Sequence, residues 1–231
     1  MSHDVYQPCP CGSGKKLKFC CFEKRKLLNH ASPTELSKKA TEFKVEQCLI
    51  NDDWQESGLA QIVLVRQMPN LKYLMGIYLV DIFCLGLKDS FLRVNFKQED
   101  VVQFIHRVPQ QLIEISYEDV RSVVLGAIEY ASQWRFEPNQ GWSQTRYLVE
   151  FDRAYEKKFT FGKEGKPLYV QGPHDNVVEI MGKLGSSIKE GEAHFMVGGE
   201  ANLFSNTEDE ESLGLTTSGS AKLLQRIKGL F

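Results

Sequence analysis

The sequence contains no apolar run approaching the roughly 20 residues that a helix needs to cross a bilayer. Its first residues, Met1 to Asp4, show no apolar segment behind a positively charged start, so a secretory signal is not expected. These two absences predict a protein of the reducing cytoplasm. Clustered cysteines in that compartment bind metals more often than they form disulfides.

Familiar catalytic and nucleotide-binding signatures are also missing. The chain has no Ser-His-Asp order, no His-Glu-x-x-His, no dinucleotide fingerprint and no Walker motif. The five histidines are scattered without metal-ligand spacing: His3, His30, His106, His174 and His194. Catalytic groups can still converge from distant parts of a chain, so these absences leave enzymatic activity open.

Length and composition allow one medium domain, or a small module and a larger one, with enough apolar residues for a packed core. The chain has 231 residues, 42% of them hydrophobic, and a net charge of −2. Residues 1–30 differ from the rest, because six basic residues stand there against two acidic ones. This basic segment predicts contact with an acidic partner or with phosphates. Its basic residues are Lys15, Lys16, Lys18, Lys24, Arg25 and Lys26.

Four of the six cysteines lie within thirteen residues, as a C-x-C pair followed, eight residues later, by a C-C pair. Zinc prefers four tetrahedral sulfur or nitrogen ligands, and two short-spaced pairs can supply them. We therefore predict a structural Zn²⁺ site with no position left for a catalytic water. Metal-free thiols, a disulfide pair and an iron–sulfur cluster are the alternatives. The predicted ligands are Cys9, Cys11, Cys20 and Cys21.

The string CPCGSGKKLKFCC, about residues 8–21, resembles the SEC-C motif, the zinc-binding element named from the C-terminal tail of the SecA translocation ATPase. It departs from the family pattern at Leu17, usually Tyr, and at Phe19, usually basic. In SecA the element helps to bind the chaperone SecB and the ribosome, so the resemblance implies a protein or ribosomal partner. The strings YLVDxxCLGxKD, GAIEYA and FGKxGKPLYVxGP, at residues 78–89, 126–131 and 161–173, are similar to strings in uncharacterised bacterial proteins with an N-terminal SEC-C motif.

The remaining chain predicts an α+β fold of mixed helices and β-hairpins. Capping signals and apolar periodicity favour helices in five segments, and β-branched and aromatic runs favour two hairpins. The expected helices cover residues 22–28, 32–49, 99–108, 117–135 and 176–184, the last capped by Asp175 and ended by Gly185. The expected hairpins cover residues 59–85 and 158–170, and residues 111–115 form a turn or strand.

Residues 77–89 place charged and thiol side chains in an otherwise apolar run. A buried carboxylate is costly unless it is hydrogen-bonded or paired. One hypothesis puts Asp81, Cys84, Lys88 and Asp89 around a pocket at the end of the sheet, with Asp81 and Cys84 as weak catalytic candidates. The favoured interpretation is that Asp81 caps the next element while Lys88 and Asp89 form an exposed turn.

These patterns predict three parts. Residues 1–30 form a zinc knuckle with a basic extension, 32–198 an α+β domain, and 199–231 an acidic, flexible tail with a short amphipathic helix over 219–231. The first functional hypothesis is an adaptor whose knuckle docks a protein or ribosomal partner. The alternatives are an enzyme with a purely structural zinc, and a nucleic-acid binder that uses the basic N-terminal segment. Substrate, partner identity and oligomeric state stay open.

Overall fold

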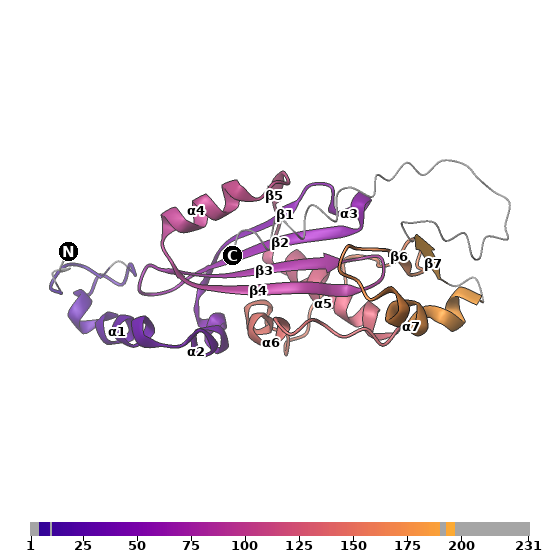
Figure 1. The fold of residues 1–231 in the computed structure, drawn as a ribbon. Helices are drawn as coiled ribbons and strands as arrows, with labels where there is room; N and C mark the ends of the chain where they lie inside the picture. Colours follow the sequence, from indigo (N-terminus) through magenta and orange to yellow (C-terminus); the bar gives the residue numbers. More distant parts are fainter. Residues whose placement is uncertain (1–4, 10, 190–192, 197–231) are drawn as a thin grey trace.

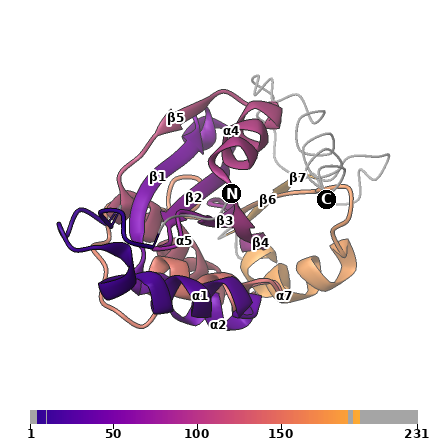
Figure 2. The ribbon, with the colours of Figure 1, turned by 90° about the vertical axis from the view of Figure 1, so that its left-hand side faces the viewer.

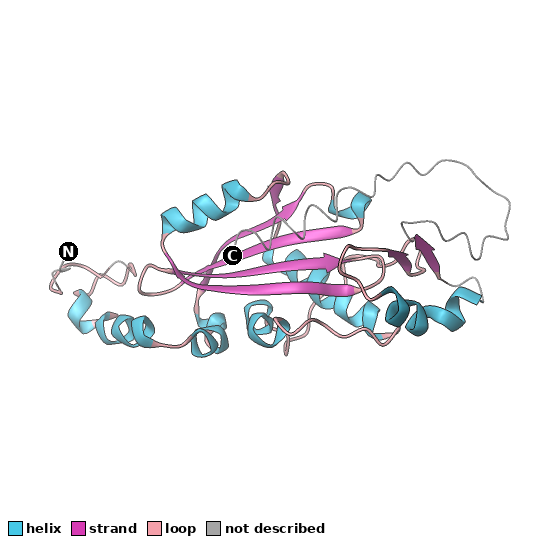
Figure 3. Ribbon diagram, in the orientation of Figure 1, coloured by secondary structure: helices cyan, strands magenta, loops and turns pink. Residues whose placement is uncertain are grey.

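A computed structural model describes residues 5–9, 11–189 and 193–196 (Figures 1–3). Its centre is a five-stranded antiparallel sheet in the order β4-β3-β2-β1-β5. The strands are β1 (Lys44–Asn51), β2 (Leu59–Gln67), β3 (Tyr73–Asp81), β4 (Gly86–Phe96) and β5 (Leu112–Glu114). A second, parallel pair consists of β6 (Leu168–Val170) and β7 (His194–Met196). Helices together with an antiparallel sheet confirm the α+β class.

Seven α-helices and three 3-10 turns surround the sheet within the described part of the chain. The α-helices are α1 (Phe22–His30), α2 (Pro33–Lys38), α3 (Trp54–Ser57), α4 (Gln98–Arg107), α5 (Tyr117–Ser132), α6 (Trp142–Thr145) and α7 (Val177–Lys189). The 3-10 turns are η1 (Leu17–Phe19), η2 (Ala40–Glu42) and η3 (Arg146–Val149). No helix among the described residues is long and apolar enough to span a membrane.

Both faces of the sheet are covered, which explains why β2 and β3 read as almost continuous apolar runs. Along β2, Ile62 and Leu64 pack into the core beneath α5, while Val63 and Val65 pack on the opposite face with Phe104 of α4. Figure 1 shows α4 on one side of the sheet and α5 and α6 on the other. Alternate side chains of one strand therefore belong to two separate cores.

The β2–β3 hairpin matches the predicted strands except that β3 ends at Asp81 and not at residue 85, and the chain beyond it differs further. The favoured exposed turn at Lys88 and Asp89 is wrong, because both residues lie on β4, which pairs with β3. The chain reverses between Asp81 and Gly86, and Gly86 adopts a positive φ of 68°. Polar residues that suggested a turn thus belong to a third long strand.

The helix expected over residues 32–49 is much shorter than predicted. Its start is correct: Ser32 caps α2, and Glu35 completes the capping box. The helix ends at Lys38, and β1 begins at Lys44. This strand pairs with β2 and, at Leu49 to Asn51, also with β5. Pairing with two neighbouring strands outweighed the helical spacing of the apolar residues.

The hairpin expected over residues 158–170 does not form. In the described chain β6 pairs in parallel with β7 instead, and only an isolated bridge joins Lys163 to Lys166. The last predicted helix exists as α7, but it continues past Gly185 to Lys189. The predicted tail and its helix over 219–231 lie outside the described residues.

A buried arginine ties the irregular segments to the sheet. Arg66 of β2 is 2% exposed, and its guanidinium stacks 4.9 Å from the ring centre of Tyr117. The guanidinium has five N–H donors in one plane and can bond to acceptors on several segments at once, which the single ammonium group of a lysine could not do. The guanidinium donates to three main-chain carbonyls and two side chains: Ala40, Phe43, Leu148, Tyr117 and Glu150.

Candidate metal centre

The cysteine-rich loop is folded by its own backbone. The amide of Cys9 donates to the carbonyl of Lys15 at 2.7 Å, and the amide of Leu17 donates to that of Gln7 at 2.9 Å. Gly12 and Gly14 adopt φ values of 78° and 70°, which residues with a Cβ rarely reach. The loop consequently doubles back and brings the C-x-C pair beside the C-C pair.

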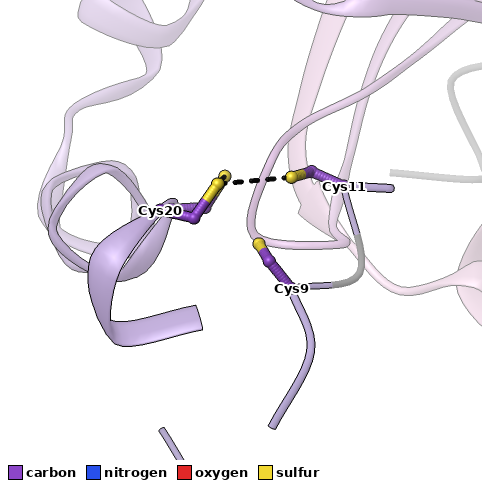
Figure 4. Close-up of side chains that lie close together, drawn as sticks. Cys9, Cys11 and Cys20 are labelled. Atoms are coloured by element: carbon purple, nitrogen blue, oxygen red, sulfur yellow. Dashed lines mark hydrogen bonds between the residues drawn. The ribbon is translucent and has the colours of Figure 1, made fainter. Parts of the chain in front are cut away.

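The four predicted ligands converge on one point. Their sulfur atoms all lie within 4.8 Å of one another, with 3.5 Å between Cys11 and Cys20 and 3.6 Å between Cys20 and Cys21. Zinc bonds of about 2.3 Å in a tetrahedron place sulfurs about 3.8 Å apart. Figure 4 shows Cys9, Cys11 and Cys20 directed toward a common centre. The residues therefore fit a metal ion bound by Cys9, Cys11, Cys20 and Cys21.

The cluster's thiols differ in acidity. The side-chain hydrogen bond from Ser13 is the main cause that lowers the pKa of Cys11 to about 6. Burial is the main cause that raises the pKa of Cys21 to about 12. Because metal-bound cysteines are thiolates, a divalent cation would have to displace the proton from Cys21.

Exposed aromatic rings and lysines flank the cluster. Tyr6 is 53% exposed and Phe19 is 69% exposed. The ammonium group of Lys18 lies 5.1 Å from the ring centre of Tyr6 and 5.8 Å from that of Phe19, and the ammonium of Lys16 lies 5.9 Å from the Tyr6 ring. Such distances allow cation–π contact. We call Tyr6, Lys16, Lys18 and Phe19 the basic–aromatic surface.

The six predicted partner-binding residues do not share one environment. Lys24 pairs with Glu42 of η2 at 3.0 Å, and Arg25 donates to the carbonyl of Pro69 in the β2–β3 turn at 2.6 Å, so both contact parts of the chain beyond α1. Lys15, Lys16 and Lys26 are exposed and form no ion pair within the described part of the chain. Lys18 also donates to the hydroxyl of Tyr6.

Asp81 and Cys84 lie at the opposite end of the sheet from the cysteine cluster. Asp81 ends β3, and its Oδ1 atom accepts the amides of Phe83 and Cys84, each at 2.9 Å. Burial raises the pKa of Asp81, and the charge of Lys88 opposes this shift. Cys84 has no exposed surface, and burial raises the pKa of its thiol. A buried, protonated thiol is a poor nucleophile.

A small cleft of about 40 Å³ lies beside Asp81 and Lys88, between β3, the start of β2 and β6. Lys88 pairs with Asp175 at 3.0 Å, and Asp89 accepts a hydrogen bond from the side-chain amide of Asn139. Asp175 was predicted to cap α7, but its carboxylate pairs with Lys88. The side-chain oxygen of Asn176 accepts the amide of Glu179 in the first turn of α7 instead. The sequence contains no local signal for these pairs, because 87 residues separate Lys88 from Asp175.

Comparison with known proteins identifies only the N-terminal segment. The family model of the SEC-C motif matches residues 7–23, which include all four clustered cysteines. No curated protein and no solved structure matches the chain. Residues 7–23 therefore carry a SEC-C motif, folded around four cysteines that can bind a metal ion.

Proposed function

We propose that the metal is zinc, and that Cys9, Cys11, Cys20 and Cys21 are its ligands. Four sulfur donors within 4.8 Å of one another favour a soft tetrahedral cation over calcium or magnesium, which prefer oxygen. With all four positions filled by thiolates, the ion would be structural. Such a site suits a reducing compartment, which we propose to be the cytoplasm.

We further propose that the protein is an adaptor whose knuckle docks a protein or ribosomal partner. The basic–aromatic surface is the observation that carries this proposal. Aromatic side chains are enriched in protein–protein interfaces, and burial of an exposed ring against a partner is favourable. Tyr6 and Phe19 lie on a small hydrogen-bonded loop together with Lys16 and Lys18, a composition that suits contact with an acidic surface of a partner.

Affinity purification from the native cell at moderate salt tests the adaptor proposal. Cys9→Ser should lose zinc and its partners together, whereas Phe19→Ala should retain zinc and lose partners. Val178→Ala, which truncates a residue 84% exposed on α7, is the matched control and should retain both. A partner set that is unchanged in Cys9→Ser and in Phe19→Ala would refute the proposal.

Nucleic-acid binding is the second candidate, supported by the alternation of lysines with exposed rings on the same surface. Rings stack on bases and ammonium groups bind phosphates, so affinity for single-stranded RNA would fall steeply with salt. A fluorescence titration with a labelled oligonucleotide measures this dependence. Absence of binding even at low salt would eliminate the candidate.

A further inference from the structure

Helix α1 is too short to be stable alone. It has nine residues, and isolated helices shorter than about 12–15 residues are marginal in water. Its stability must therefore come from the α+β domain, and four of its side chains contact that domain. Leu28 is buried in the main core, Lys24 pairs with Glu42, Arg25 bonds to Pro69, and Asn29 bonds to Asn70.

Arg25 makes the most buried of the polar contacts. Its Nε atom donates to the carbonyl of Pro69 in the turn between β2 and β3, and its Nη2 atom is buried without a hydrogen-bond partner among the described residues. That turn is itself ordered by the amide of Met68, which donates to the carbonyl of Lys72 at 2.8 Å. Figure 1 shows α1 next to this turn.

The backbone of Arg25 also forms a hydrogen bond with the backbone of a predicted metal ligand in the first turn of the helix. Helix α1 begins at Phe22, directly after Cys20 and Cys21. The backbone amide of Arg25 donates to the carbonyl of Cys21 at 2.8 Å. If α1 frayed, the carbonyl of Cys21 would lose this bond. Metal binding would then have to order additional residues of α1, and the entropy cost would lower the metal affinity.

We propose that Arg25 is a positioning residue for the metal centre. By docking α1 on the β2–β3 turn, it holds Cys20 and Cys21 in the ligating arrangement. The metal affinity of the knuckle thus depends on a contact with the α+β domain. Coupling between two equilibria is reciprocal, so metal binding also stabilises the docked helix and the turn. This inference rests on the proposed zinc site.

Competition for zinc with a chromophoric chelator, using the full chain, tests the inference. Loss of one hydrogen bond in Arg25→Ala should lower the zinc affinity by about three- to tenfold. Lys26→Ala is the matched control, because it removes the same charge from an exposed position of the same helix and should leave the affinity unchanged. Arg25→Lys, which retains a donor, should recover part of the loss.

Hydrogen exchange measures the reciprocal effect at the other side of the contact. Removal of zinc from the wild-type protein should speed exchange of the Met68 and Leu71 amides, which are bonded within the β2–β3 turn. The amides in the middle of β2 and β3 should keep their protection. In Arg25→Ala the two turn amides should exchange at similar rates with and without zinc.

A second variant guards against a general folding defect in Arg25→Ala. Asn29→Ala removes the acceptor of the Asn70 side-chain amide and leaves the Asn70 oxygen that accepts the Lys72 amide, so the turn is preserved. It too should weaken zinc binding. Equal zinc affinities in wild type, Arg25→Ala and Asn29→Ala would overturn the inference. A wild-type protein that binds no zinc would instead refute the metal proposal.

Discussion

Buried charged side chains stabilise turns and irregular segments of this protein. Asp81 is 8% exposed and accepts two amides of the turn that joins β3 to β4. Arg66 satisfies carbonyls on both η2 and η3. In each case the side chain replaces bonds that regular secondary structure would otherwise supply, so a structural role explains its burial.

Substitutions at Asp81 separate this structural role from the charge. Asp81→Ala leaves two buried amides without an acceptor and should lower the free energy of unfolding by about 2 kcal/mol. Asp81→Asn keeps an oxygen acceptor and removes the buried charge, so its stability at neutral pH should lie within about 1 kcal/mol of wild type or above it. Urea denaturation measures both values.

The pH dependence of the same variants provides the control. Burial raises the pKa of Asp81, so the folded protein retains this proton to a higher pH than the unfolded chain. The contribution of Asp81 is therefore most favourable below its ordinary pKa and is lost as the pH rises through the folded value. The stability of Asp81→Asn relative to wild type should increase over that window. A constant difference would contradict the argument.

At the scale of elements, predictions from local sequence signals succeeded where the tertiary structure favours the same type of element. Ser116 caps α5 by accepting the amide of Asp119, and the helix follows its predicted apolar stripe. Strand β1 shows the opposite case, since the helix predicted over residues 32–49 covers most of this strand, which pairs on both edges. Neighbouring strands, which local periodicity cannot represent, decided its structure.

The packing of α6 on β4 can be tested at one glycine. Gly141 has a φ of −60°, which alanine adopts easily, but an added Cβ would overlap the carbonyl oxygen of Ser90. Gly141→Ala should therefore destabilise the protein by about 2 kcal/mol. The matched control is Gly182→Ala on α7, where a Cβ meets nothing within 4 Å. It should be neutral or stabilise by up to about 1 kcal/mol, because alanine favours helix.

Urea midpoints of the two glycine variants, measured under the same conditions, separate a steric effect from a general effect of replacing glycine. A Gly141→Ala protein as stable as Gly182→Ala would show that α6 can move away from β4 at little cost.

At the scale of the whole molecule, the metal centre lies beyond one end of the central sheet, and α1 connects the two (Figure 1). Among the described residues before Ala31, only Leu28 belongs to the main buried core. The core otherwise consists of side chains from the sheet, α5 and the segments around them. The sheet should therefore fold without the metal, in contrast to small zinc domains that unfold when it is removed.

Metal removal tests this independence. We expect elemental analysis to find one zinc per chain, and a strong chelator to remove it while the amides of β2 and β3 stay protected from hydrogen exchange. Added zinc should restore the starting exchange pattern near α1. Global loss of protection on chelation would show that the zinc site is required for the whole fold.

The amino-acid sequence alone determined the features whose interactions are local. Four cysteines within thirteen residues predict one metal cluster, and the capping residues Ser32 and Ser116 mark the starts of α2 and α5. In each case the interacting groups are joined by short lengths of chain, so few arrangements are available to them.

Only the tertiary structure decided the pairings between distant residues. Lys88 meets Asp175, Arg66 meets Glu150, and β6 pairs with β7 across long separations in sequence. It also decided that Arg25, a basic residue beside the cysteine cluster, contacts the β2–β3 turn. These contacts depend on which surfaces the packed sheet brings together, and neither composition nor periodicity encodes that arrangement directly.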